Sequence, residues 1–180
     1  AGNITTTGLI TGGGNDLTIQ GSGANSINST SGIGALALNQ TGGSITFTGN
    51  LDTATLTTAA NNFNIALQGT TNTVTGGAST TFTNTGALTL GNGAGDSTTF
   101  TNGLTATAPT TLSLGGTIAT TNTGMSLGAA GLNSNTVLNS GSGTLGTGAI
   151  TGGGKDLTVQ GSGTNTIAST SGIGALALNQ

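Results

Sequence analysis

The sequence carries almost no charge and lacks six residue types altogether. Its 180 residues include no Arg, Glu, His, Cys, Trp or Tyr, and only one Pro. The charged residues are Lys155 and four aspartates, Asp16, Asp52, Asp96 and Asp156, so 3% of the chain is charged. A typical soluble domain has about 25%. These gaps exclude several classes of function before any motif is considered.

Each absence removes a kind of chemistry. Binding to nucleic acid or to an anionic membrane surface needs clustered Lys or Arg, and one lysine cannot supply it. Without Cys there is no disulfide framework and no thiolate metal site, although the cellular compartment stays open. Without His, Cys or Glu, acid–base catalysis would depend on four scattered aspartates, and no base is present to activate a Ser or Thr hydroxyl. We therefore predict no enzyme activity, no catalytic, cofactor-binding or metal-ligating residue, and no cofactor.

The two ends of the sequence and its apolar runs give further expectations. No run of 18 apolar residues occurs, so we expect no membrane-spanning helix. The chain opens with Ala-Gly-Asn and shows neither a start Met nor a signal peptide. This suggests a piece of a longer protein.

Gly makes up 36 of the 180 residues, and Thr, Asn and Ser supply much of the rest. Such a composition is also found in flexible linkers. However, β-branched residues and Leu recur in short apolar-x-apolar runs, the period of a strand with one buried face, and disordered chains usually lack these. The expected strand positions are Leu17/Ile19, Leu36/Leu38, Ile45/Phe47, Ala54/Leu56, Ile65/Leu67, Val74, Phe82, Leu88/Leu90, Phe100, Leu112/Leu114, Ile118, Leu127, Val137, Ile150 and Leu157/Val159. Gly, Asn and Ser clusters between them are typical of turns.

A long repeat divides the chain. Residues 11–40 and 151–180 are identical at 25 of 30 positions, with an offset of 140 residues. We therefore predict that residues 1–140 form one tandem unit and residues 141–180 the start of the next, in one continuous rod without a separate domain. The array is expected to continue in both directions.

A shorter repeat lies inside the long one. The hexapeptide STTFTN occurs at residues 79–84 and again at residues 97–102, a step of 18. The same step places Phe47, Ile65, Phe82, Phe100 and Ile118 on one track, with gaps of 18, 17, 18 and 18. A short repeat with one buried hydrophobe per cycle is the signature of a solenoid. We predict turns of roughly 17–19 residues, about eight turns in each 140-residue unit, and units that start in the same rotational phase.

The expected architecture is all-β, a parallel β-solenoid with right-handed coiling, which is the default for parallel crossovers. Eight turns at about 4.8 Å each give about 38 Å per unit. Phe82 and Phe100 should point inwards and stack one turn apart. Pro109 should lie at a corner or a strand end because it cannot donate to a strand ladder. Residues 104–108 and 132–145 fit the cycle least well, and we expect irregular corners or altered turn lengths there.

Three patterns resemble binding motifs. Residues 141–146 match G-x-G-x-x-G, but chance produces such a match in a Gly-rich chain and no βαβ context surrounds it. Residues 11–19 and 91–99 partly resemble calcium-binding nonapeptide repeats. Each stands alone and offers one carboxylate, so we interpret both as Gly-Asn-Asp turns and leave weak calcium binding open.

Thr-Phe-Thr triplets occur at residues 46–48, 81–83 and 99–101. Rows of paired outward threonines on a flat solenoid face are typical of ice-binding β-helices. On the same track, however, Asn64 with Ala66 and Thr117 with Ala119 interrupt the row. The alternative is that these threonines are simply good strand formers on a solvated face.

The general residue pattern of the whole chain, without a diagnostic motif, resembles that of the β-solenoid shafts of large secreted bacterial proteins. The runs that carry this resemblance are NITTTG at residues 3–8, DLTIQG at residues 16–21 and GALTL at residues 86–90. The nearest analogues are filamentous-haemagglutinin-like adhesins and autotransporter passenger domains. The resemblance implies export to the bacterial cell surface and a role in adhesion, biofilm or fibre formation.

The expected function is therefore a structural segment of a long extracellular bacterial β-solenoid fibre or adhesin. Its expected partners are copies of itself, end to end and laterally, and cell-surface or matrix polysaccharide; nucleic acid and a membrane span are not expected. The alternative is a binding module, either an ice-binding Thr-rich face or a carbohydrate-contacting adhesin face.

Overall fold

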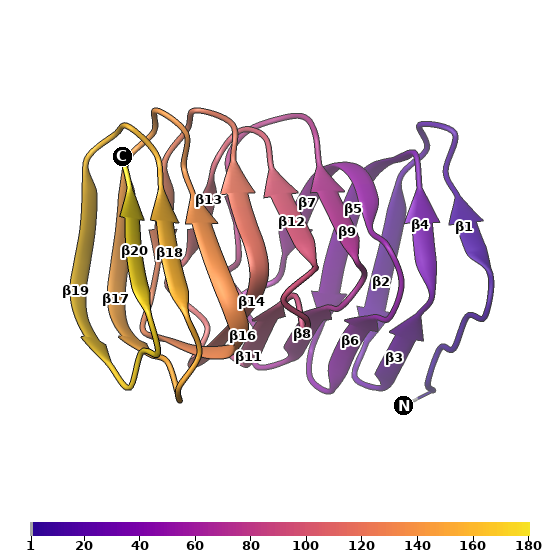
Figure 1. The fold of residues 1–180 in the computed structure, drawn as a ribbon. Helices are drawn as coiled ribbons and strands as arrows, with labels where there is room; N and C mark the ends of the chain where they lie inside the picture. Colours follow the sequence, from indigo (N-terminus) through magenta and orange to yellow (C-terminus); the bar gives the residue numbers. More distant parts are fainter. Residues whose placement is uncertain (1) are drawn as a thin grey trace.

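The computed structural model describes residues 2–180, and these form an all-β rod (Figure 1). The strands pair in parallel and stack turn on turn as a β-solenoid of about nine turns. The two termini lie at opposite ends of the rod (Figure 1). The predicted all-β class and parallel β-solenoid architecture are confirmed.

The strands make up three faces, which we call A, B and C in the order in which the chain visits them. Face A contains β2 (Leu17–Gly21), β5 (Ile33–Gln40), β10 (Thr80–Thr81), β13 (Leu104–Ala106) and β15 (Met125–Leu127). Face B contains β3 (Ala24–Ile27), β6 (Ser44–Phe47), β8 (Asn64–Leu67) and β11 (Ala87–Leu90). Face C contains β1 (Leu9–Thr11), β4 (Ser29–Ser31), β9 (Thr71–Val74), β12 (Ser97–Phe100), β18 (Leu157–Gln160) and β20 (Leu176–Asn179). Five longer strands pass round a corner and belong to two faces: β7 (Asp52–Thr58), β14 (Thr111–Thr120), β16 (Ala130–Asn139), β17 (Leu145–Thr151) and β19 (Asn165–Ser171). The strand β5 also begins on face C, where Ile33 pairs with Thr53 of β7, before it continues on face A.

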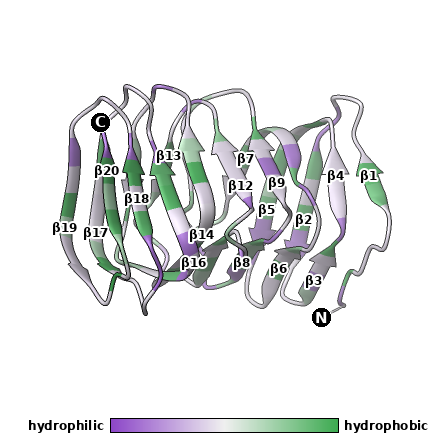
Figure 2. Cartoon of the chain, viewed as in Figure 1, coloured by the Kyte–Doolittle hydropathy of each residue, from purple (hydrophilic) through white to green (hydrophobic). Residues whose placement is uncertain are grey.

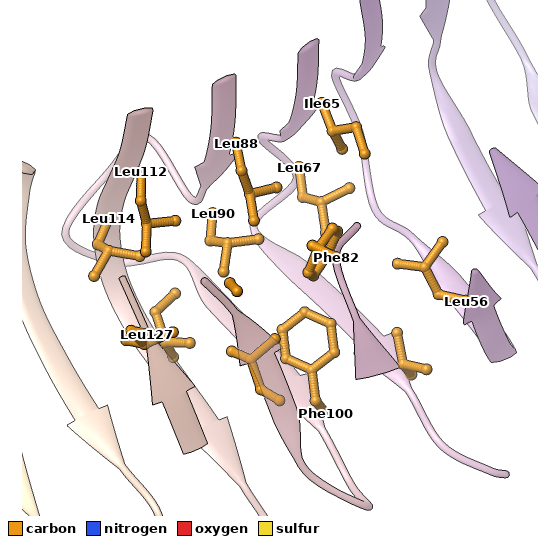
Figure 3. Packing of buried hydrophobic residues seen from close by; sticks show 14 of the residues in the cluster. Leu56, Ile65, Leu67, Phe82, Leu88, Leu90, Phe100, Leu112, Leu114 and Leu127 are labelled. Atoms are coloured by element: carbon orange, nitrogen blue, oxygen red, sulfur yellow. The ribbon is translucent and has the colours of Figure 1, made fainter. Parts of the chain in front are cut away.

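The core is a single apolar column inside the three faces. Within most strands buried and half-exposed residues alternate, as period-2 side-chain orientation requires. Like residues stack directly on one another along face B, where the inward row consists of Ile45, Ile65, Leu88 and Leu112. Hydrophobic segments therefore follow one another along the rod (Figure 2), and their side chains meet in its interior (Figure 3). Burial of each such side chain contributes roughly 1.5–3 kcal/mol.

The turns are longer than the sequence repeat indicates. Paired residues on neighbouring turns lie 18 to 26 positions apart, and the commonest offset is 20, as for Ser44 and Asn64. The longest turn separates Thr71 from Ser97. The predicted turn of 17–19 residues is therefore too short for most of the rod.

The predicted phenylalanine track is wrong, although all five of its residues are buried. Phe47 pairs with Leu67 on face B, whereas Phe100 pairs with Val74 on face C. Phe82 follows β10 on face A. Phe82 and Phe100 do point inwards, but they meet across the core edge to face, with ring centroids 5.8 Å apart and an interplanar angle of 90°. The 18-residue step thus spans two faces of one long turn.

The 140-residue unit does not close on a whole number of turns. Leu17 lies on face A, paired with Leu36, whereas its repeat equivalent Leu157 lies on face C, paired with Leu176. The chain makes six full turns from β2 to β17 and then passes two further faces to reach β18. One unit therefore spans about 32 Å at about 4.8 Å per turn, in place of the predicted 38 Å. Successive units are rotated by one face.

Of the smaller predictions, some are confirmed and some are wrong. Pro109 lies in the corner between β13 and β14, as predicted. A register shift separates the Leu114 pair from the Gly116 pair where β14 meets β16, which confirms irregularity after Leu132. Leu104–Ala106 forms the strand β13, which is paired on both sides, but it lies 24 residues beyond its partner in β10 instead of the common 20, so the turn length is altered there as predicted. Val137 faces outwards, and its neighbour Leu138 supplies the buried side chain.

Candidate functional site: the open ends of the solenoid

The four aspartates bond backbone amides. Asp16 and Asp156 each accept a hydrogen bond at 2.8 Å from the amide of a residue one turn further on, Ala35 and Ala175 respectively. Asp52 accepts one at 2.8 Å from Gly32. Asp96 accepts two at 2.8 Å, from the amides of Asn92 and Gly93, within its own turn. At both Gly-rich segments, residues 11–19 and 91–99, the aspartate thus bonds backbone amides of the fold. Residues 2–180 contain no cluster of three or more His, Cys, Asp or Glu that could hold a metal ion.

Asn and hydroxyl side chains have the same role at other corners. Asn25, Asn50 and Asn64 each accept a hydrogen bond, at 2.8 to 3.0 Å, from an amide one turn away. A corner breaks the backbone ladder, so a side-chain oxygen takes the place of the missing carbonyl. Much of the polar content of the sequence is therefore used by the fold itself.

The G-x-G-x-x-G match at residues 141–146 covers a corner and the first two residues of β17. Gly143 donates its amide to the carbonyl of Ser140 at 2.9 Å, and the strand β17 follows. A dinucleotide site needs a helix N-terminus at this point to receive the phosphates. The interpretation of the match as coincidental is consistent with this geometry.

The three Thr-Phe-Thr triplets do not form one row. Thr46 lies on face B, Thr81 on face A and Thr99 on face C, because the 18-residue step changes face. The structure instead pairs other hydroxyls on face C. Two adjacent outward rows run through three strands there, one of Thr71, Ser97 and Thr117 and one of Thr73, Thr99 and Ala119.

Face A bears a shallow groove of about 550 Å³ that crosses β13, β15, β17 and β19. Small outward residues form its floor in one row, Thr105, Ser126, Gly146 and Thr166. The four phenylalanines, the only aromatic residues of the chain, are all buried in the core. Neither this groove nor the rows on face C therefore offers an aromatic platform of the kind on which sugars commonly stack.

The most unusual surface is the C-terminal end of the rod. Leu176 and Leu178 are 49% and 59% exposed, whereas their repeat equivalents Leu36 and Leu38 are 0% exposed. The exposed pair borders a hollow of about 310 Å³, also lined by Val159 and Ile167. Inside the rod the equivalent residues Leu36 and Leu38 are covered by Leu56 and Thr58 of β7.

The opposite end is open as well. Ile4 is 44% exposed, and the inward residues Ile10 and Leu17 are only half-buried. Ile10 pairs with buried Thr30 and Leu17 with buried Leu36, so each is covered on one side only. The sequence signal for this difference in burial is the repeat itself, because the same residues occur once inside the rod and once in its last turn.

Comparison with known proteins identifies no relative: no family model, no curated protein and no solved structure matches the chain. Within residues 2–180, no helix is long and apolar enough to cross a membrane.

Proposed function

We propose that this chain is a structural segment of a long extracellular bacterial β-solenoid, a fibre or adhesin shaft that spaces or links cells and has no catalytic activity. The observation that carries the proposal is the tandem repeat inside one rod. Residues 11–40 recur at residues 151–180 with 25 of 30 positions identical, and both copies form turns of the same continuous solenoid. Such a repeat lengthens a rod by adding turns of the same kind.

The chemistry of the chain fits a shaft. Its Asp carboxylates and Asn side-chain oxygens accept hydrogen bonds from backbone amides at the corners. With 3% charged residues, little electrostatic repulsion opposes close packing of rods side by side. The resemblance in texture to filamentous-haemagglutinin-like adhesins and autotransporter passenger domains supports the same assignment, with a location outside the bacterial cell.

Electron microscopy and fibre diffraction of the purified chain test this function. Rods longer than one chain, with a meridional spacing of about 4.8 Å, are expected. A protein that sediments as a compact monomer at all concentrations, with no elongated species in the micrographs, would contradict it.

A second candidate function, ice binding, is favoured by one observation. Thr71, Thr73, Ser97, Thr99 and Thr117 present five hydroxyl groups in two adjacent rows on face C. Thermal hysteresis measured on the purified chain tests this function. Activity that disappears in Thr99→Lys and persists in Thr105→Lys on face A would support it, and an absence of hysteresis would remove it.

A further inference from the structure

The corner at residues 91–96 is longer than its counterpart one turn earlier. It joins β11 on face B to β12 on face C with six residues, whereas residues 68–70 make the same connection between β8 and β9 with three. The extra residues raise the spacing of paired residues from 23 at β8–β11 to 26 at β9–β12. Asn92, Ala94 and Gly95 are exposed. The longer corner therefore presents an asparagine and its neighbouring backbone to solvent on the side of the rod.

The residue after Asn92 is Gly93. In an Asn-Gly pair the backbone nitrogen of the glycine can attack the side-chain carbonyl carbon of the asparagine, and a glycine hinders this approach least because it has no Cβ. Among the residues that the structure describes, the side chain of Asn92 has no hydrogen-bond partner and is exposed. The side chain is therefore free to turn towards the Gly93 nitrogen.

The amide nitrogen of Gly93 already faces a base. It donates a hydrogen bond at 2.8 Å to Oδ2 of Asp96, and the amide of Asn92 donates a second at 2.8 Å to the same oxygen. A backbone nitrogen becomes a good nucleophile only as it loses its proton, and a carboxylate within hydrogen-bond distance can accept that proton. Asp96 is buried, so its carboxylate is held in this position. The corner thus brings together a nucleophile, a proton acceptor and an unrestrained side-chain amide.

We propose that Asn92 is a site of spontaneous deamidation in which Asp96 acts as the base. Oδ2 of Asp96 takes the proton of the Gly93 nitrogen as this nitrogen attacks Cγ of Asn92. The new bond from nitrogen to Cγ closes a succinimide ring, and the bond from Cγ to Nδ2 breaks. The proton passes from Asp96 to the departing nitrogen, which leaves as ammonia. Water then opens the ring at either carbonyl and leaves aspartate or isoaspartate at position 92.

A second Asn-Gly pair, Asn102-Gly103, lacks this arrangement. Nδ2 of Asn102 donates a hydrogen bond at 2.8 Å to the carbonyl of Gly77, which ties the side chain to the neighbouring turn. The amide of Gly103 donates to the carbonyl of Phe100 at 3.3 Å, and a peptide carbonyl is too weak a base to take up the proton. The same dipeptide therefore should react at different rates at the two places.

The reaction changes the corner in which it occurs. Isoaspartate adds a methylene group to the backbone between positions 92 and 93, so the two amides that now share Oδ2 of Asp96 can no longer both reach it. Either product also adds a carboxylate close to Asp96, and like charges at short distance repel. We therefore expect a local loosening of this corner and one more negative charge on a chain whose net charge is −3. This inference is independent of the proposed function.

Mass spectrometry of the purified chain, incubated at neutral pH, tests the inference. Cleavage on the N-terminal side of the aspartates places Asn92 in residues 52–95 and Asn102 in residues 96–155, so each site is followed in its own fragment. Deamidation replaces an NH2 group with OH, and this mass gain is expected severalfold sooner in residues 52–95. In denaturant, where the fold no longer holds the corner, the two sites should react at similar rates. Equal rates in the folded chain, or a faster Asn102, would overturn the inference.

Two glycine variants assign the reaction to Asn92. A methyl group on Gly93 would lie 3.4 Å from Oδ1 of Asp96, an ordinary contact, so Gly93→Ala should keep the corner while it hinders the attacking nitrogen. The mass gain in residues 52–95 should then appear severalfold later. Gly95→Ala is the matched control, because a methyl group there meets nothing within 4 Å and should leave the rate unchanged. A Gly93→Ala variant that reacts as fast as the unchanged chain would place the reaction at another asparagine.

The variant Asp96→Asn tests the base. Its side-chain oxygen can still accept the two amide hydrogen bonds but cannot take up the proton, so the reaction at Asn92 should slow severalfold. The pH profile should change as well. With Asp96 present the rate at Asn92 should rise less steeply with pH than the rate at Asn102, where the proton must go to hydroxide, and the variant should show the steep rise at both sites.

The variant loses the cleavage before residue 96, so fragmentation of the longer peptide locates the modified residue. Circular dichroism confirms that the variant keeps its β-structure. An unchanged or faster reaction in Asp96→Asn, with an unchanged pH profile, would show that the carboxylate only holds the corner, and its role as the base would be wrong.

Discussion

The two copies of the long repeat, residues 11–40 and 151–180, have the same local structure in different surroundings. In the first copy Ala35 bonds Asp16 at 2.8 Å, and in the second Ala175 bonds Asp156 at 2.8 Å. Gly14 and Gly154 adopt the same left-handed conformation, with φ of 86° and 83°. Local sequence therefore specifies the corner completely, wherever it lies on the rod.

The two copies differ in the face that they occupy and in whether a further turn covers them. The first copy places its strand β2 on face A and the second places the equivalent β18 on face C. The first is covered by a further turn and the second is not, so Leu38 is buried and Leu178 is exposed. In a solenoid, whether a side chain is buried depends on the neighbouring turns as well as on its own turn.

The largest expected effect concerns Leu38 and Leu178, the equivalent residues whose exposure differs most between the two copies. Leu38→Asp would bury an unpaired carboxylate and should cost about 3–5 kcal/mol, enough to disrupt the turns around it. Leu178→Asp places the same carboxylate in water at the open end and should cost less than about 1 kcal/mol in the monomer. Chemical denaturation of the two variants at low protein concentration measures the difference. Equal losses would mean that the end is covered even in the monomer.

The fold class could be predicted because its signal is local. Alternating pairs such as Leu36/Leu38 and Ile45/Phe47 require a strand with one buried face, and the clusters of Gly and Asn between them require corners. Both features were found at the expected places. Pro109 was placed correctly for the same reason, since its constraint is its own backbone.

The turn length and the face of each strand could not be predicted, because period-2 alternation is identical on all three faces. The hexapeptides around Phe82 and Phe100 are the same, yet one lies on face A and the other on face C. The spacing between two copies of a short sequence therefore need not equal a whole number of turns, because the second copy can lie on a different face from the first. The sequence around Leu36 is also identical to that around Leu176, so it could not show which of the two is covered by a further turn.

The next effect should be similar in both copies, because it tests the shared corner. A methyl group on Gly34 would lie 2.7 Å from Asp16 Oδ1, and one on Gly174 would lie 2.7 Å from Asp156 Oδ1. Each would also collide with the carbonyl of the glycine before that aspartate, Gly14 or Gly154. Either Gly→Ala change should cost on the order of 2 kcal/mol. Thermal melts of the two variants check this, and a harmless Gly174→Ala would show that the terminal corner adapts where the interior one does not.

A smaller effect is expected from loss of the corner carboxylate. Asp16→Ala leaves the amide of Ala35 without its acceptor and should cost about 1–2 kcal/mol. Asp156→Ala does the same to Ala175, but here the turn above is the last one and can open on its own. Amide exchange followed by NMR should therefore show a local acceleration at Ala175 without a matching loss of global stability. Unchanged protection of both amides would show that the carboxylates do not hold the corners.

The smallest effect concerns the one charge difference between the copies. The side chain of Asn15 donates a hydrogen bond to the carbonyl of Gly12 at 2.8 Å, on the surface of the corner. Its counterpart Lys155 keeps only the backbone bond of that turn, from its amide to the carbonyl of Gly152 at 3.0 Å. Asn15→Lys removes the side-chain bond from a solvated site and should cost about 0.5 kcal/mol or less, while Lys155→Asn should restore the bond and gain a similar amount. Denaturation midpoints of the two exchanges, measured against the unchanged chain, should move by similar small amounts in opposite directions. Because the corners are otherwise alike, a shift several times larger in either variant would mean that the lysine has a contact of its own, and the equivalence of the two corners would no longer hold at this position.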